Sequence, residues 1–168
     1  LDAGLDDLLF TLESFEGGRV LDTIASDANA TSTISHSVKT AKGVTVGRFI
    51  QRWSATAIGP EAEFEFQLDA GLPELPRVGL ATALVPGFER VLWYGRGPQE
   101  CYSDRKTGTR IGQWSSTVEE LLVPYILPQE NGNRTDVRAV SLQNADGKSL
   151  TLDGYGSVTS DSFDFTAT

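Results

Sequence analysis

Residues 62–69 alternate between apolar and polar side chains along their whole length. Successive residues of a β-strand point to opposite faces of a sheet, so this pattern predicts a strand with one buried and one solvated face. Phe64, Phe66 and Leu68 would face the core. Antiparallel sheets often expose one face to water, whereas parallel sheets bury both. The alternation therefore favours an antiparallel sheet.

Further strands are predicted where β-branched residues cluster between Gly, Pro, Asn or Asp turns. They cover residues 20–25, 31–39, 44–57, 77–84, 90–94, 136–142, 149–152 and 162–166. Residues 40–43 and 144–147 are predicted hairpin turns. Residues 1–16 fit a helix turn or an irregular strand equally well. The pattern predicts an all-β fold, an antiparallel β-sandwich, formed by a single domain over residues 1–168.

One short helix is predicted near the middle of the chain. Ser116 precedes Glu119 by three residues, which is the capping-box arrangement of a helix N-terminus. Elsewhere no convincing helix start occurs, so we expect at most one or two short helices.

The charge of the chain excludes some classes of partner. The formal net charge is −9 and the pI is about 4.5. Nucleic-acid binding needs a basic face that displaces counterions, and an anionic membrane surface would also repel this chain. No segment is as long and apolar as a transmembrane helix. The first residues lack the features of a signal peptide, so we expect a cytoplasmic location.

The chain holds one cysteine, Cys101, and one histidine, His36. A single cysteine excludes an internal disulfide and a cysteine-based zinc site, and we expect no metal site. A thiol nucleophile would need a histidine beside it. His36 lies in an alternating stretch that predicts a strand, so a structural role is favoured.

Two loops gather most of the polar groups that folding alone does not require. The first loop is residues 97–105 and the second loop is residues 129–134. With their neighbours they hold Glu100, Asp104 and Glu130; Arg96, Arg105 and Arg134; and Trp93, Tyr94, Tyr102 and Trp114. Carboxylates, guanidinium groups and aromatic rings together suit a sugar, whose hydroxyls need donors and acceptors and whose C–H face stacks on a ring. The sequence does not establish whether the two loops converge.

Glu100 and Glu130 could form a glycosidase pair, because such carboxylates lie about 5 to 9 Å apart across the bond that is cleaved. The sequence does not set their separation. Loop glutamates near arginines are more often structural partners, so the structural interpretation is preferred for both.

Three ordered blocks, residues 75–80, 91–106 and 124–138, resemble the C-terminal small-chain domain of the large β-galactosidases of glycoside hydrolase family 2. Cys101 stands where that family more often has Asn. The resemblance implies a galactose mutarotase-like supersandwich, of which this chain would be a fragment cut at both ends. It also implies that the two catalytic glutamates, and the magnesium and sodium sites, belong to a barrel domain outside this chain.

The resemblance implies a site wall rather than a catalytic centre. The expected partners are the remaining domains of the same polypeptide and a β-galactoside that the whole enzyme would hydrolyse with retention. The chain alone would have no catalytic residue, no cofactor and no activity. The expected wall residues are Gly97, Pro98, Gln99, Glu100, Tyr102, Asp104 and Arg105, supported by Trp93, Tyr94, Arg96, Glu130, Asn131 and Arg134.

Two other functions stay open. The aromatic and arginine content of the loops also suits a free-standing carbohydrate-binding module. An aldose epimerase, as found among mutarotase relatives, would need histidine acids, and His36 alone makes that the weaker alternative. Unpaired strand edges of a truncated sandwich would also favour self-association into a homo-oligomer.

Overall fold

The computed structural model describes residues 8–17, 30–57, 59–73, 79–127, 129–154 and 162–167. The predicted strand at residues 20–25 and the start of the one at 77–84 lie outside these ranges. The chain divides into two compact units, Leu1–Gly79 and Leu80–Thr168, which are described separately. A single domain over residues 1–168 therefore stays a prediction.

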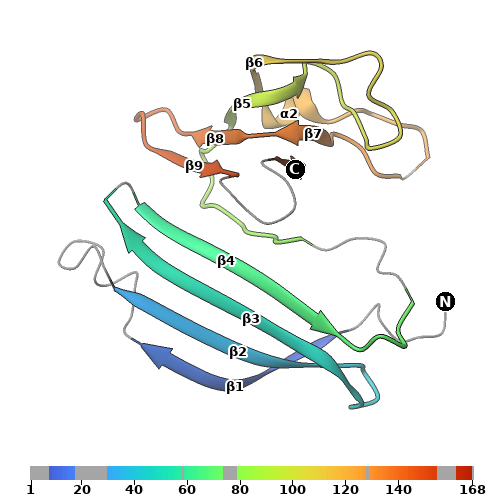
Figure 1. Cartoon of the computed structure of the whole chain (residues 1–168). Helices are drawn as coiled ribbons and strands as arrows, with labels where there is room; N and C mark the ends of the chain where they lie inside the picture. The colour runs from blue at the N-terminus through green and yellow to red at the C-terminus, as the bar shows by residue number, and fades with distance from the viewer. Residues whose placement is uncertain are drawn as a thin grey trace. The chain divides into compact units, whose positions relative to one another are not determined.

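Unit 1 contains a four-stranded sheet in which every neighbouring pair is antiparallel (Figure 1). Its strands follow chain order: β1 (Leu9–Gly17), β2 (Thr31–Lys39), β3 (Thr45–Thr56) and β4 (Gly59–Leu68). The β2–β3 turn closes with a hydrogen bond from the Gly43 amide to the Thr40 carbonyl (2.8 Å), so the hairpin predicted at residues 40–43 is confirmed. Residues 9–17, left open between helix and strand, form β1.

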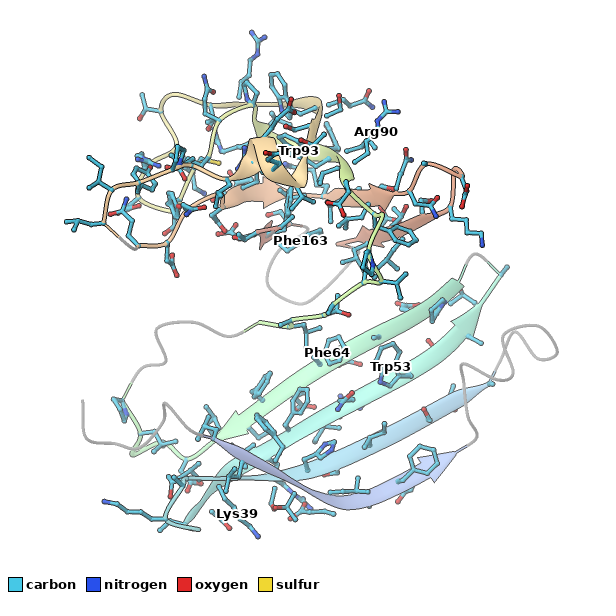
Figure 2. The ribbon with its side chains drawn as sticks, turned by 180° about the vertical axis from the view of Figure 1, so that it is seen from behind. Lys39, Trp53, Phe64, Arg90, Trp93 and Phe163 are labelled. Carbon is cyan, nitrogen blue, oxygen red and sulfur yellow. The ribbon has the colours of Figure 1, made fainter. Side chains whose placement is uncertain are left out.

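The two faces of the unit 1 sheet differ as the alternation predicts. Phe49 pairs with Phe66 in register, and their rings stack with centroids 4.4 Å apart. Trp53 meets Phe64 edge-on at 5.7 Å on the same face (Figure 2). The opposite face carries ion pairs from Arg48 to Glu13, and from Arg52 to Glu63 and Glu65.

Unit 2 combines a second four-stranded antiparallel sheet with a two-stranded ribbon and a short helix. The sheet has the order β6 (Arg110–Thr117), β5 (Arg90–Gly97), β8 (Ala139–Gln143) and β9 (Ser149–Asp153). The ribbon pairs β7 (Arg134–Val137) with β10 (Phe163–Phe165). The helix is α2 (Val118–Leu121).

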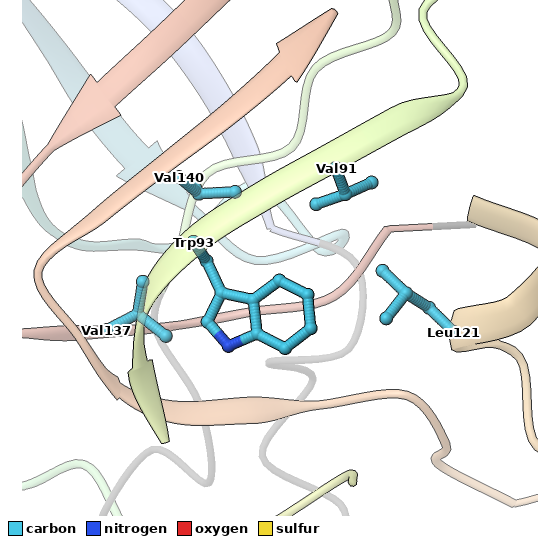
Figure 3. Close-up of a cluster of buried hydrophobic side chains, with 5 residues drawn as sticks. All are labelled: Val91, Trp93, Leu121, Val137 and Val140. Atoms are coloured by element: carbon cyan, nitrogen blue, oxygen red, sulfur yellow. The ribbon is translucent and has the colours of Figure 1, made fainter. Parts of the chain in front are cut away.

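The core of unit 2 lies between this sheet, the ribbon and the helix. Its buried members are Val91, Trp93, Leu121, Val137 and Val140 (Figure 3). The indole of Trp93 also meets the ring of Phe165 edge-on at 5.9 Å. A core filled from β5, α2, β7, β8 and β10 holds strand β5 firmly, and the first loop begins where β5 ends.

Three details of the predicted elements are wrong. Residues 79–84 form no strand, and all of them except the half-buried Leu84 are exposed. The helix is capped by Thr117 with Glu120, one residue later than predicted, because strand β6 continues through Thr117, which still pairs with Arg90. The strand predicted at residues 136–142 is two strands that break at Arg138. Strand β6 was not predicted.

The predicted fold class is confirmed over the described residues, where every strand pair is antiparallel and α2 is the one α-helix. None of the helices described there is long and apolar enough to cross a membrane.

Candidate functional site

The first and second loops, which the sequence left unconnected, pack directly against each other. The Cys101 amide donates to the Asn133 carbonyl (2.8 Å), and the Asn133 side-chain Nδ2 donates to the Cys101 carbonyl (2.8 Å). The Gly132 amide donates to Glu100 Oε2 (2.8 Å). Both loops are anchored at the same end of unit 2, because one leaves β5 and the other enters β7.

Glu100 is the centre of this contact. Its side chain is 8% exposed and accepts hydrogen bonds from Gly132, Tyr102, Tyr125 and Arg105. Burial by itself would raise the pKa of this carboxyl, but the bonds from Tyr125, Gly132, Arg105 and Tyr102 outweigh it and hold the pKa below its ordinary value. Glu100 is therefore an ionised acceptor with its lone pairs occupied, which is the geometry of a structural group.

Glu130, the other carboxylate considered for a glycosidase pair, is exposed. The two glutamates thus occupy different environments. A general acid needs a raised pKa, and that of Glu100 is shifted the opposite way. The geometry supports the structural interpretation of Glu100.

Arg134 is a buried residue that connects the two loops by hydrogen bonds to the backbone of each. It is 4% exposed, and its guanidinium donates to the Gly132 carbonyl (2.7 Å) and to the Pro98 carbonyl (3.1 Å). It also lies over the ring of Trp93, 5.4 Å from the centroid. Burial lowers the pKa of this guanidinium. Its Nε is buried and has no hydrogen-bond partner among the described residues.

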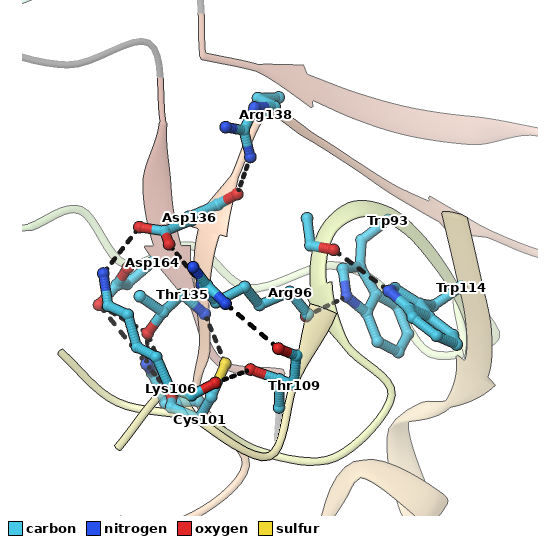
Figure 4. Close-up of polar contacts among 12 residues, drawn as sticks. Trp93, Arg96, Cys101, Lys106, Thr109, Trp114, Thr135, Asp136, Arg138 and Asp164 are labelled. Atoms are coloured by element: carbon cyan, nitrogen blue, oxygen red, sulfur yellow. Dashed lines mark hydrogen bonds and ion pairs between the residues drawn. The ribbon is translucent and has the colours of Figure 1, made fainter. Parts of the chain in front are cut away.

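Asp136 organises a second polar cluster that sequence reasoning missed (Figure 4). Its carboxylate accepts from Arg96 Nε (2.5 Å) and Lys106 Nζ (2.9 Å). The hydrogen bond from Arg96, which has the larger effect, and the hydrogen bond from Lys106 both lower the pKa of Asp136. Arg96 also donates to the Thr109 carbonyl (3.2 Å), so the cluster holds the segment that follows the first loop. Asp136 has φ of 54°, a left-handed conformation that Asp tolerates better than β-branched residues do.

The two tryptophans considered as sugar-stacking faces both donate a hydrogen bond to the backbone of β5. Trp93 is buried and donates its Nε1 to the Arg96 carbonyl (2.9 Å). Trp114 donates its Nε1 to the Gly95 carbonyl (3.1 Å). A Cβ on Gly97 would lie 2.7 Å from Trp114 Cδ1, so only glycine fits there.

The two tyrosines lie nearer the surface. Tyr94 is exposed beneath the guanidinium of Arg138, at 5.8 Å, and the guanidinium of Arg105 lies over the ring of Tyr102 at 5.0 Å. The sequence placed all four aromatic residues in one group, because residue type does not reveal which rings are buried in the core.

Cys101 is completely buried. Its Sγ accepts from the Thr135 amide (3.3 Å), and its carbonyl accepts from Thr135 Oγ1 (3.1 Å). Asn133 and Thr135, both buried, thus fasten the first loop through its cysteine. A thiol in this setting fills space rather than acts as a nucleophile, in line with the structural role expected from the sequence.

An open depression of about 400 Å³ lies beside the first loop, lined by Gln99, Glu100, Arg105, Gly108 and Thr109. Of the other predicted wall residues, Pro98 and Asp104 are exposed, whereas Gly97 is buried and Asn131 half-buried. In the described ranges, no group of three or more His, Cys, Asp or Glu side chains could hold a metal ion. The structure brings most of the predicted residues together, but whether they contact a sugar stays a prediction.

Comparison with known proteins gives a consistent result. Residues 8–168 match the family described as beta galactosidase small chain. A β-galactosidase of Aeromonas hydrophila is 32% identical over 142 residues, covering 79% of this chain and 13% of the relative. Those of Vibrio cholerae and Priestia megaterium are 44% identical over 94 residues and 40% identical over 87 residues, covering 54% and 52% of this chain. The chain spans 8% to 13% of the length of these three relatives.

Proposed function

Because this chain belongs to the β-galactosidase small-chain family, we propose that it is one part of a larger β-galactosidase and that its first loop forms part of the wall of the sugar site. The observation that carries the proposal is the set of four hydrogen bonds that the Glu100 carboxylate accepts. They fix the loop from inside, so its outward side chains are presented in one arrangement. A preorganised wall orders few groups when it meets a ligand, which favours binding.

The chemistry of the depression suits a polyol. Gln99 supplies an amide with donors and an acceptor, Arg105 a forked donor, and Thr109 a hydroxyl that already donates to the Lys106 carbonyl (2.9 Å). Sugar hydroxyls both donate and accept, so a mixed lining of this kind complements them. In this proposal the wall residues orient the galactoside and perform no proton transfer.

The catalytic glutamates of the retaining reaction, and the magnesium and sodium ions that the family implies, would lie in the remainder of the polypeptide. Glu100 supports this division, because its lone pairs are occupied and its pKa is lowered. We expect the 168-residue chain alone not to hydrolyse a nitrophenyl β-galactoside, whereas the full polypeptide does. Hydrolysis by the chain alone that Glu100→Gln abolishes, with the fold intact, would overturn the proposal.

The wall itself is tested in the full polypeptide with Gln99→Ala. Loss of one amide at the wall should raise KM for the galactoside several-fold while the protein stays folded. Gln113→Ala is the matched control, because Gln113 is exposed on β6 and does not line the depression. Equal KM values for the two variants would remove Gln99 from the site.

A second function, sugar binding by this chain alone, is favoured by one observation: Gln99, Arg105 and Thr109 bring hydrogen-bond donors and acceptors to one depression. Trp114 is a natural reporter, because it packs against Gly97 at the start of the first loop. Titration with galactose or lactose to millimolar concentration should then change tryptophan fluorescence and saturate. The absence of a saturable change would remove this function.

A further inference from the structure

Residues 122–127, which follow α2, carry apolar side chains that the fold leaves exposed. Ile126 is 99% exposed and Leu127 75%, and Leu122 and Tyr125 are also exposed. No charged residue occurs between Leu122 and Leu127. Single exposed apolar residues are normal on a protein surface, but a contiguous group marks a surface that another molecule or domain covers.

The exposed segment is fixed at two points. The preceding residue, Leu121, is 1% exposed and packs in the core of unit 2. The Tyr125 hydroxyl donates to Glu100, and the Tyr125 amide donates to the Val123 carbonyl (2.8 Å). A segment already held in one conformation loses little freedom on association, which favours docking as a preformed element.

We propose that residues 122–127 dock into an apolar pocket on the remainder of the same polypeptide, outside residues 1–168. This rests on the proposed function, which makes the chain one part of a larger enzyme. The relatives leave ample room for such a pocket, because the chain spans only 8% to 13% of their length. Docking would also hold the wall, since Tyr125 connects the segment directly to Glu100.

Charge selects this occupant over a second copy of the chain. Glu119 and Glu120 precede the segment and Glu130 follows it, and the whole chain carries a net charge of −9. Two copies meeting through this segment would bring like charges together, which disfavours association. The complementary surface is therefore an apolar pocket bordered by Lys or Arg side chains.

The test is photo-crosslinking in the full polypeptide. Ile126→p-benzoylphenylalanine places the reactive group in the segment, and Val44→p-benzoylphenylalanine is the control, because Val44 is an exposed apolar residue in the β2–β3 turn. Mixing ¹⁵N-labelled and unlabelled protein separates crosslinks within one polypeptide from those between two. The same substitution at Leu127 gives an independent reading if the larger side chain at position 126 prevents docking.

The expected result is a crosslink from residue 126 or 127 to a peptide outside residues 1–168 of the same polypeptide. The control with the reactive group at position 44 should not give a crosslink to that peptide. Crosslinks between labelled and unlabelled polypeptides, crosslinks confined to residues 1–168, or no crosslink from either position would overturn the proposal. Galactoside hydrolysis is measured on the same samples before irradiation. An inactive protein that still gives the expected crosslink overturns the proposed activity and leaves the docking intact.

Discussion

Glu100→Gln tests whether the two loops are held together through one carboxylate. The Glu100 Oε2 accepts from Gly132 and Tyr102, and Oε1 accepts from Tyr125 and Arg105. Glutamine converts one of these oxygens into an amide nitrogen, which is itself a donor. Whichever oxygen is replaced, two donors then face a donor.

The structure indicates which arrangement costs least. Tyr125 and Arg105 are exposed and can turn to water, so the amide nitrogen should face them, and the Arg105 side chain, 56% exposed, stays solvated when its ion pair with Glu100 is lost. The two bonds from Gly132 and Tyr102 remain but lose their charge-assisted strength. Charged hydrogen bonds contribute about 1.5–3 kcal/mol each and neutral ones about 1, so we expect the free energy of unfolding to fall by about 2 kcal/mol.

Urea denaturation followed by tryptophan fluorescence measures the change. With m near 2 kcal/mol per molar, the midpoint should fall by about 1 M at pH 7. Glu119→Gln, an exposed residue of α2, is the matched control and should shift the midpoint little. A Glu100→Gln midpoint equal to that of the control would refute the reasoning.

The effect should also depend on pH with a definite sign. The folded-state pKa of Glu100 lies below the ordinary value of 4.5, so ionised Glu100 stabilises the fold above that pH. Its contribution is lost as the pH falls through the folded-state pKa. The difference between wild type and Glu100→Gln should therefore shrink below about pH 4.5, and a difference that grows in acid would contradict the assignment.

Three further predictions concern unit 2. Gly95→Ala should destabilise it by about 1–3 kcal/mol in urea, because the new Cβ would lie 2.7 Å from the Val137 Cα, whereas Gly108→Ala meets no atom within 4 Å and should be near neutral. Cys101 should resist a thiol reagent in the native protein and react at once in concentrated urea; rapid native labelling would contradict its burial. Asp136→Asn, which keeps the left-handed conformation accessible but removes the charge, should lower the urea midpoint measurably at pH 7, and this cost should shrink as the pH falls through the folded-state pKa of Asp136, which lies below the ordinary value of 3.8.

The sequence predicted correctly those strands in which apolar and polar residues alternate, because this alternation determines which face of the strand packs in the core. The run from residue 62 to 69 coincides with β4 within a few residues, because Phe64 and Phe66 must reach the same face as Phe49. Strand β6 was missed because an apolar residue, Ile111, is at an exposed position and Gly112 and Ser116 are at half-buried ones, so residue type does not follow the alternation of burial. The position of α2 shifted by one residue because the sequence holds two overlapping capping boxes, and β6 extends to Thr117, so the second box, Thr117 with Glu120, caps the helix.

The contact between the loops could not be predicted, because it depends on strands far apart in sequence. Glu100 and Gly132 are 32 residues apart and meet only because β5 and β7 pack together in the core of unit 2. Asp136 was missed for a related reason. Its sequence context is that of a strand, which does not reveal the left-handed backbone at Asp136 or the contacts of its carboxylate with Arg96 and Lys106.

The carboxylate and the guanidinium that made the two loops look catalytic in the sequence both bind the backbone of Gly132. Glu100 accepts from the Gly132 amide, and Arg134 donates to the Gly132 carbonyl. The buried carboxylate and the buried guanidinium thus both bind the backbone of one turn, where φ of +76° favours glycine. Buried charges need such partners to offset their desolvation. A cluster of carboxylate, guanidinium and glycine can therefore serve to hold two loops together without acting on a substrate.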